Sequence, residues 1–265
     1  MISEYKANMG AATAIRLQVE SSLAQRVPAA LTLKIKQAPE LFSTGMASVD
    51  AMLGGGIPRS SITEVSGAAS TGKTSFALSM LAKVTQLGNA CVWVDVNDAL
   101  SPESAAAAGV DLRRLLWLRM SAERRRNKDE KPWSRLDQAL RSTDLLLQTG
   151  GFAVIVLDMS DVLPQHAMRI PLATWYRFRL AAEHARSALV FLTQSPCASS
   201  CAALTLRCDT AQTKLFSEHG ETPLFEQQHY QLVRERNRNE GSPFHQKKPI
   251  TSVAWAAETQ WMRCG

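Results

Sequence analysis

The alternation of apolar and polar positions predicts a chain in which strands and helices follow one another. Short apolar runs predict strands at 62–65, 91–94, 115–118, 152–157 and 188–193, and amphipathic stretches predict helices at 76–87, 102–108, 134–148 and 172–186. The run at 152–157 has no polar position, which is typical of a strand covered on both faces. We therefore expect an α/β fold with a mostly parallel central sheet and helices on both faces.

The two ends of the chain carry different patterns. Residues 11–25 predict a helix, and residues 31–35 alternate as a short strand. We therefore expect an N-terminal helix–strand segment over 1–40 and a core over 41–265. Further strands are predicted at 204–208, 230–234 and 252–255, and they would form a short antiparallel C-terminal extension of the sheet.

Composition narrows the class of protein. With 45% hydrophobic and 20% charged residues, the chain has the composition of a soluble globular protein. No apolar run is long enough to span a bilayer, and residues 1–10 lack the apolar stretch of a signal peptide. We therefore expect a cytoplasmic protein with no membrane contact. The formal net charge of +6 is compatible with a polyanionic partner such as nucleic acid, although many basic proteins bind none.

One local motif carries specific chemistry. The motif G-x-x-x-x-G-K-S/T occurs after the strand 62–65 and before the helix 76–87, as Gly67, Ala68, Ala69, Ser70, Thr71, Gly72, Lys73 and Thr74. Its glycines let backbone N–H groups curl around a phosphate, and the helix N-terminus adds a partial positive charge. Lys73 is expected to reach the β- and γ-phosphates and the Thr74 hydroxyl to ligate Mg²⁺. The motif predicts binding of ATP with Mg²⁺.

Two polar residues at strand ends complete the predicted catalytic set with Lys73. Asp158 follows the buried strand 152–157, where its carboxylate would hold Mg²⁺ through water at the sheet edge beside the phosphate loop. Gln194 follows the strand 188–193 and is placed to sense the γ-phosphate. The alternative for Gln194 is a strand-end amide that is simply hydrogen-bonded.

Together these stretches resemble the RecA family over most of the chain. The resemblance is carried by residues 41–45 and 49–58 before the phosphate loop, by 94–102, 108–111 and 115–116 after it, and by the strand ending at Asp158 and Gln194. It implies a RecA-like P-loop ATPase core. Arg236 and Arg238 stand where this family places paired lysines that reach the ATP of a neighbouring subunit.

The chain also departs from the RecA pattern. Asn97 occupies the position of the glutamate that activates the attacking water, and an amide cannot accept that proton. Asp95 and Asp98 are the nearby alternatives, although a shift of one or two positions moves a carboxylate by several ångströms. The segments after Asp158 and Gln194 are short where the family carries loops that grip single-stranded DNA. We therefore expect weak or absent ATP hydrolysis.

A shortened RecA-like core of this kind resembles the ImuA-type proteins of bacterial mutagenic repair. The matching stretches are 26–28, 139–148 and 169–179. The resemblance implies an SOS-induced accessory in DNA repair and translesion synthesis after DNA damage. The implied partners are an inactive Y-family-like polymerase subunit and an error-prone replicative-type polymerase, with RecA as a further candidate.

Two other functions remain open at this point: a DNA-dependent ATPase recombinase that forms filaments on single-stranded DNA, and a RecA-fold ATPase unrelated to DNA. Asn97 and the short loops count against the first, and the ImuA-like stretches count against the second. Self-association through residues 1–40 is expected, unless this segment folds back on its own core or binds another partner.

Direct DNA contact, if the chain makes it, should be weak, salt-sensitive and indifferent to base sequence. The basic residues for it are Arg124, Arg125, Arg126, Arg234, Arg236, Arg238, Lys247 and Lys248, and the aromatic residues near them are Trp133, Tyr230 and Phe244. Arg236 and Arg238 therefore have two alternative roles, contact with DNA phosphates or contact with a neighbour's ATP.

Overall fold

The computed structural model describes residues 40–120, 134–216, 224–237 and 251–258, with the backbone alone at 210–216, 224–229 and 256–258, and also Gln18 and Ser22. The chain divides into two compact units, 1–38 and 39–265. In the first unit Gln18 and Ser22 are helical, and the Ser22 hydroxyl donates to the Gln18 carbonyl oxygen at 2.9 Å. The rest of the predicted helix 11–25 and the predicted strand 31–35 lie outside the described residues.

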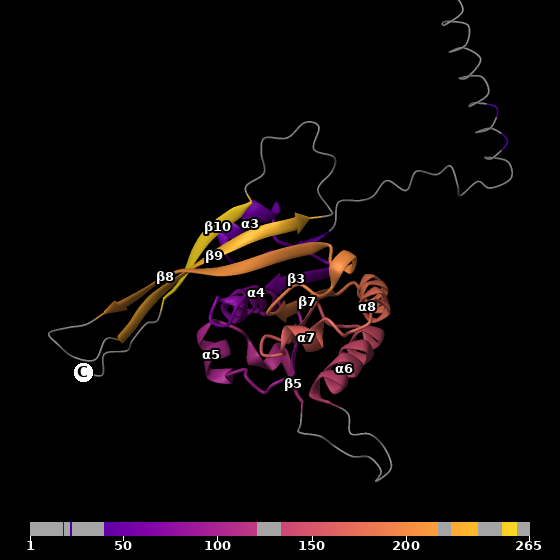
Figure 1. Cartoon of the computed structure of the whole chain (residues 1–265), viewed down its shortest axis with the longest axis horizontal. Coiled ribbons are helices and arrows are strands. Elements are labelled where there is room, and N and C mark those ends of the chain that lie inside the picture. Colours follow the sequence, from indigo (N-terminus) through magenta and orange to yellow (C-terminus); the bar gives the residue numbers. More distant parts are fainter. Residues whose placement is uncertain are drawn as a thin grey trace, which may run out of the picture. The chain divides into compact units, whose positions relative to one another are not determined.

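A single large sheet organises the described part of the second unit (Figure 1). Its strand order is β10-β9-β8-β3-β7-β6-β4-β5. The strands are β3 (Ile62–Ser66), β4 (Cys91–Asp95), β5 (Leu115–Arg119), β6 (Val154–Asp158), β7 (Ala188–Thr193), β8 (Leu204–Phe216), β9 (Leu224–Asn237) and β10 (Ser252–Glu258). Neighbours from β5 to β8 are parallel, whereas β8–β9 and β9–β10 pair antiparallel. This arrangement confirms the predicted α/β fold with its antiparallel C-terminal end.

Helices cover both faces of this sheet. They are α3 (Ala47–Leu53), α4 (Lys73–Gln86), α5 (Pro102–Ala107), α6 (Arg135–Thr149), α7 (Pro164–Ala167) and α8 (Leu172–Ala185). Val154 and Val156 of β6 belong to a core with α3, α4 and α5, while Ile155 and Leu157 belong to a core with α6, α7 and α8. Successive strand side chains point to opposite faces, so a strand covered on both faces must be apolar at every position.

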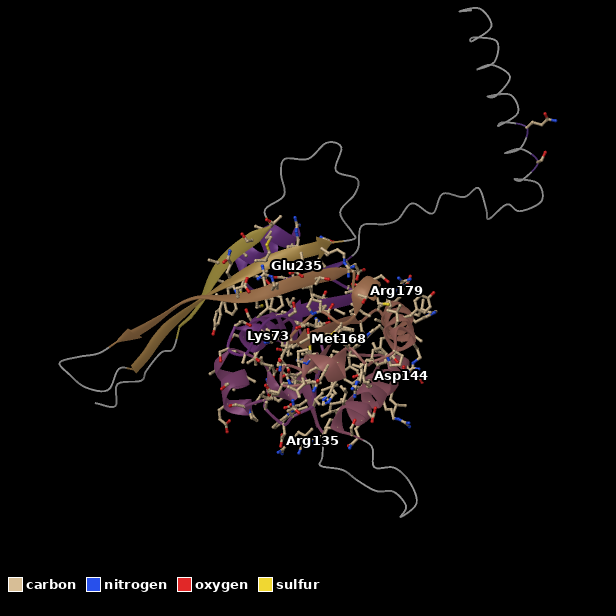
Figure 2. The ribbon with its side chains drawn as sticks, viewed as in Figure 1. Lys73, Arg135, Asp144, Met168, Arg179 and Glu235 are labelled. Atoms are coloured by element: carbon tan, nitrogen blue, oxygen red, sulfur yellow. The ribbon has the colours of Figure 1, made fainter. Side chains whose placement is uncertain are left out.

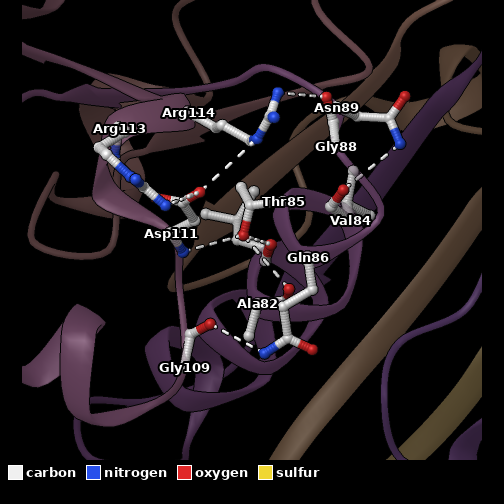
Figure 3. A network of polar contacts seen from close by, with 11 residues as sticks. Ala82, Val84, Thr85, Gln86, Gly88, Asn89, Gly109, Asp111, Arg113 and Arg114 are labelled. Carbon is white, nitrogen blue, oxygen red and sulfur yellow. Dashed lines mark hydrogen bonds and ion pairs between the residues drawn. The ribbon is translucent and has the colours of Figure 1, made fainter.

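The C-terminal end of α4 is tied to the segment that follows α5 (Figure 3). The Thr85 hydroxyl accepts the Asp111 N–H at 3.1 Å, and the Gln86 amide donates to the Gly109 carbonyl oxygen at 3.0 Å. Arg114 donates to the Gly88 carbonyl oxygen at 2.6 Å. These contacts hold the far end of α4 in place, and α4 begins at the phosphate loop.

The structure also shows elements that periodicity did not predict. Short strands β1 (Leu41–Phe42) and β2 (Ile57–Pro58) form a separate antiparallel pair, and α7 has a single turn. Two 3₁₀ turns, η1 (Leu112–Arg114) and η2 (Ser199–Cys201), precede β5 and β8. The helix predicted from residue 76 begins at Lys73, so the last motif residues form its first turn.

Candidate nucleotide site

The loop between β3 and α4 closes around a lysine amine. Lys73 Nζ donates hydrogen bonds to the carbonyl oxygens of Gly67 and Ala68, each at 2.6 Å. The Thr71 hydroxyl donates to the same Ala68 oxygen at 2.8 Å. Ser70 has a left-handed backbone conformation, with φ of 60°. A compact turn with a left-handed residue is typical of loops whose backbone N–H groups face a common anion.

Burial sets the electrostatics of Lys73. The residue is 4% exposed. Burial lowers the pKa of its amine, whereas the neighbouring Cys208 and Asp158 oppose that shift. Charges interact more strongly where the effective dielectric is below that of water, so a phosphate gains more from this amine than from a surface lysine.

A cavity of about 300 Å³ brings the phosphate loop and the end of β6 together. Lys73 and Thr74 line it from the loop, and Asp158 lines it from β6. The Thr74 hydroxyl and the Asp158 carboxylate offer oxygen ligands, the type that Mg²⁺ requires. The residues present therefore fit a triphosphate with its metal ion. The remaining lining residues are Ala69, Ser70, Thr71, Gly72, Ser75, Ala99, Ser160, Asp161 and Tyr230.

Asp158 is a buried carboxylate with one backbone partner. Its Oδ1 accepts the Ser160 N–H at 3.0 Å. Burial raises the pKa of Asp158, and the Ser160 hydrogen bonds offset part of that shift. A buried anion is costly without a cation, so this position favours a bound metal ion or a proton.

Tyr230 of β9 is a site residue that the sequence motif does not reveal. Its side chain is 6% exposed and lines the cavity, and its ring packs against the ring of Trp255 with centroids 4.6 Å apart. A Cβ on Gly72, where φ is 86°, would lie 2.6 Å from the Tyr230 ring. The ring therefore packs directly against the phosphate loop, and this burial argues against a role for Tyr230 in stacking DNA bases.

Two carboxylates near Asn97 are occupied by other partners. Asp95 accepts the N–H groups of Ala99 at 3.1 Å and Leu100 at 2.9 Å, and the Trp117 indole N–H at 3.1 Å. Asp98 accepts two hydrogen bonds from Arg119, each at 2.6 Å, which hold the pKa of its carboxyl below the usual value. Both carboxylates therefore serve local structure, and neither lines the nucleotide cavity.

Asn97 lines a neighbouring cavity of about 580 Å³. Arg135 and His166 line the same cavity, and Asp161 lines both this cavity and the nucleotide cavity. The predicted water-activating position therefore lies next to the phosphate site but is not part of its wall. Asp161 is the carboxylate that connects the two spaces, and sequence patterns gave no signal for it.

Gln194 does not belong to the residues that line the nucleotide cavity. The preceding residue, Thr193, accepts the Gly67 N–H through its carbonyl oxygen at 3.1 Å. The end of β7 is thus joined to the first residue of the phosphate loop. This contact gives Gln194 a backbone connection to the loop, while its predicted sensing of the γ-phosphate stays a prediction.

A family profile described as the RecA N-terminal domain matches residues 17–170. The chain belongs to this family. Membership confirms the predicted RecA superfamily assignment, and the match spans the phosphate loop and the Asp158 strand. RecA-family proteins generally bind ATP with Mg²⁺, which agrees with the residues that line the cavity.

Curated relatives support the same family. The chain is 38% identical over 129 residues to protein RecA of Saccharopolyspora erythraea, covering 48% of the chain and 34% of that protein. The chain is also 36% identical over 129 residues to protein RecA of Rhizobium rhizogenes, covering 48% of the chain and 32% of that protein. The matches span about a third of the length of these relatives, so family membership does not extend their complete activities to this chain.

The fold of this chain is also found in a solved structure. The crystal structure of the RadB recombinase superposes with a TM-score of 0.53 at 18% identity, covering 82% of this chain and 96% of that one. At this level of identity the likeness concerns the fold alone. In the part of the chain that the structure describes, no helix is long and apolar enough to cross a membrane.

Arg236, predicted from the resemblance to reach a neighbour's ATP, contacts its own chain. Its Nη2 donates to the carbonyl oxygens of Ser199 and Ala202, the latter at 3.3 Å, and to the Thr205 hydroxyl at 3.4 Å. The guanidinium therefore holds the segment between β7 and β8. Arg238 lies outside the described residues, as do Arg124, Arg125, Arg126, Lys247 and Lys248.

Glu64 of β3 also anchors this segment. It is 1% exposed, and its Oε1 accepts the N–H groups of Cys197 at 2.6 Å and Ala198 at 3.1 Å. Burial raises the pKa of the Cys197 thiol, and the adjacent Glu64 carboxylate adds to the shift. The short segment between β7 and β8 is thus held by a buried glutamate and by Arg236.

Proposed function

We propose that this chain is an ATP-binding accessory protein of DNA repair that acts in SOS-induced translesion synthesis, with weak or absent ATP hydrolysis. One observation carries the nucleotide part: Lys73, Thr74 and Asp158 line one cavity, whereas Asn97 lines another. A site with phosphate and metal ligands but without a placed general base favours binding over turnover. General base catalysis typically contributes ~10²–10⁴ in rate.

In this proposal each residue has a defined task. Backbone N–H groups of the loop and the Lys73 amine bind the phosphates, and the N-terminus of α4 adds its partial charge. The Thr74 hydroxyl and the Asp158 carboxylate would hold Mg²⁺. The metal ion, when bound, neutralises phosphate charge.

Two variants test the proposal. Lys73→Ala removes a charge-assisted contact of roughly 1.5–3 kcal/mol, so calorimetry should show at least a tenfold loss of ATP affinity. Lys83→Ala, on the exposed side of the same helix, is the control and should bind ATP as the unaltered chain does. Unchanged affinity in Lys73→Ala would contradict the nucleotide site.

Asn97→Glu tests the reason for slow turnover. A carboxylate at this position lies in the cavity that shares Asp161 with the nucleotide site, so the rate should rise about tenfold or more. Steady-state ATP hydrolysis with and without single-stranded DNA measures it. A rate in the unaltered chain that is already stimulated strongly by DNA, together with strand exchange, would favour the recombinase instead.

The accessory role rests on the resemblance of residues 139–148 and 169–179 to ImuA-type proteins. The partners we propose are an inactive Y-family-like polymerase subunit and an error-prone replicative-type polymerase, with RecA as a further candidate. Co-purification of these proteins with the tagged chain from DNA-damaged cells is the expected result. Their absence would remove the translesion assignment and leave the nucleotide site untouched.

We propose two alternative roles for the arginines at the end of β9 and beyond it: contact with DNA phosphates, or contact with the ATP of a neighbouring subunit. Arg236 already donates to its own chain, which favours a positioning role. Arg238 keeps both alternatives. An alanine variant of Arg238 should lose nucleotide-dependent assembly if it contacts ATP in trans, or should lower the salt slope of DNA affinity if it contacts DNA.

A further inference from the structure

An apolar stripe runs along the exposed side of α8. Leu172, Tyr176 and Leu180 recur at every fourth position and are 54%, 50% and 40% exposed. Residues four apart share one face of a helix. The opposite side of α8 is fully used, since Trp175 and Phe178 are buried in the core.

Two further exposed apolar side chains precede α8 in the chain. Met168, which lies between α7 and α8 and is labelled in Figure 2, is 69% exposed, and Leu163 ahead of α7 is 50% exposed. Single exposed apolar side chains are ordinary, but a row on one helix with further members beside it marks an interaction site. Neither α8 nor these two residues line the nucleotide cavity.

The segment that contains α8 is predominantly basic. Residues 169–186 contain four arginines, at 169, 177, 179 and 186, and one carboxylate, Glu183, which gives +4 − 1 = +3. Arg177 is already paired with Asp144 of α6 at 3.1 Å, and the exposed His184 lies four residues after Leu180 on the same helix. The Arg179 guanidinium (labelled in Figure 2) lies 5.2 Å from the centre of the Tyr176 ring, so one cation borders the stripe directly.

We propose that this α8 surface binds an amphipathic helix of another protein that carries Leu-like side chains on one face and Asp or Glu along its edges. The apolar stripe matches the anchors of such a helix, and the arginines match its carboxylates. A second copy of this chain is the poorer occupant, because an isologous contact would place the same +3 segments face to face. The inference goes beyond nucleotide binding and does not depend on it.

Photo-crosslinking in the native cell identifies the occupant. The chain carries Tyr176→p-benzoylphenylalanine, with Leu87→p-benzoylphenylalanine as control, because Leu87 is 66% exposed at the end of α4. The expected adduct joins Tyr176's position to a segment of another protein with apolar residues three or four apart and an excess of Asp and Glu. Adducts confined to a second copy of this chain or to nucleic acid, or no more adduct than at position 87, would overturn the proposal.

The crosslinked segment, made as a fluorescent peptide, then measures the contributions by anisotropy with the full chain. Tyr176→Ser should weaken binding about tenfold or more, and Arg179→Glu about fivefold with a reduced salt dependence. Leu87→Ser should bind as the unaltered chain does. All three substitutions are at exposed or half-buried positions, and thermal melting together with ATP affinity confirms that each variant is folded. Unchanged peptide binding by Arg179→Glu would refute the acidic character of the partner.

Discussion

At the scale of single residues, Gly72 illustrates how tightly the phosphate loop is built. Its left-handed φ of 86° and the Tyr230 ring 2.6 Å from a would-be Cβ are two separate constraints. Gly88, at the end of α4, has nearly the same φ of 88° but no atom within 4 Å of a would-be Cβ. A substitution at Gly88 therefore introduces backbone strain alone, whereas a substitution at Gly72 introduces both backbone strain and a steric clash with Tyr230.

Gly72→Ala should therefore abolish or severely weaken ATP binding, because the loop or the Tyr230 ring must move. Gly88→Ala should cost only the backbone strain, of order 1 kcal/mol, and should keep the ATP affinity. Calorimetric titration of both variants with Mg²⁺-ATP measures the difference. Equal effects of the two changes would mean that the Tyr230 contact does not shape the site.

The buried carboxylate of Asp158, a proposed Mg²⁺ ligand, makes the free energy of unfolding depend on pH. Burial raises its pKa above the value of 3.8, so the folded chain binds more protons than the unfolded chain between that value and the folded pKa. The free energy of unfolding from this group therefore falls as the pH rises through that window. Asn in its place carries no charge and still accepts the Ser160 N–H.

Asp158→Asn should raise the melting temperature of the nucleotide-free chain at neutral pH, because it removes a charge that burial disfavours. It should also weaken the dependence of ATP binding on Mg²⁺. Thermal melts from pH 4 to 8 measure the first effect. Asp98→Asn is the control of opposite sign, because Arg119 lowers the pKa of Asp98 and that carboxylate stabilises the fold. A lower melting temperature for Asp158→Asn would contradict the argument.

At the scale of elements, the segment between β7 and β8 is held by side chains from two other strands, β3 and β9. Glu64 accepts two of its N–H groups, and Arg236 donates to two of its carbonyl oxygens. Because β3 lies between β7 and β8, the anchoring acid sits on the strand that leads into the phosphate loop. A shift of this segment would therefore move Glu64 and, with it, the strand that leads into the phosphate loop.

Glu64→Ala leaves two buried N–H donors unpaired and should destabilise the fold by about 1–3 kcal/mol for each donor that finds no other partner. Urea denaturation measures the total, and hydrogen exchange at the Cys197 and Ala198 amides should accelerate. Glu183→Ala on α8, whose side chain is exposed, is the control and should change neither. Unaltered exchange at the two amides would show that Glu64 does not anchor the segment.

At the scale of the whole molecule, the first compact unit, 1–38, contains most of the predicted self-association segment 1–40. Deleting it leaves the contact between Glu40 and Arg59 at 2.8 Å intact, so the second unit should keep its ATP affinity. Light scattering should show assemblies of the full chain that the deletion reduces to monomers. An unchanged mass distribution would assign this segment to its own core or to another partner.

Much of the fold was predictable because its signals are local. Apolar runs, a helix period and a glycine-rich turn each depend on residues close together in the sequence, so the strands β3 to β7, the phosphate loop and Asp158 could be recognised from the order of residues alone. Family membership followed from the same stretches. The extent of β8 and β9 was underestimated because polar residues interrupt their pattern.

Only the tertiary structure decided which distant side chains meet. Tyr230 packs against Gly72 because β9 is joined to β8, and β8 lies beside the strand that leads into the phosphate loop. The Trp117 indole N–H donates a hydrogen bond to Asp95 because β5 pairs with β4. Strand order determines these neighbours, and no period or motif in the sequence records strand order. For the same reason Arg236, placed by resemblance at a neighbour's ATP, is found holding its own chain.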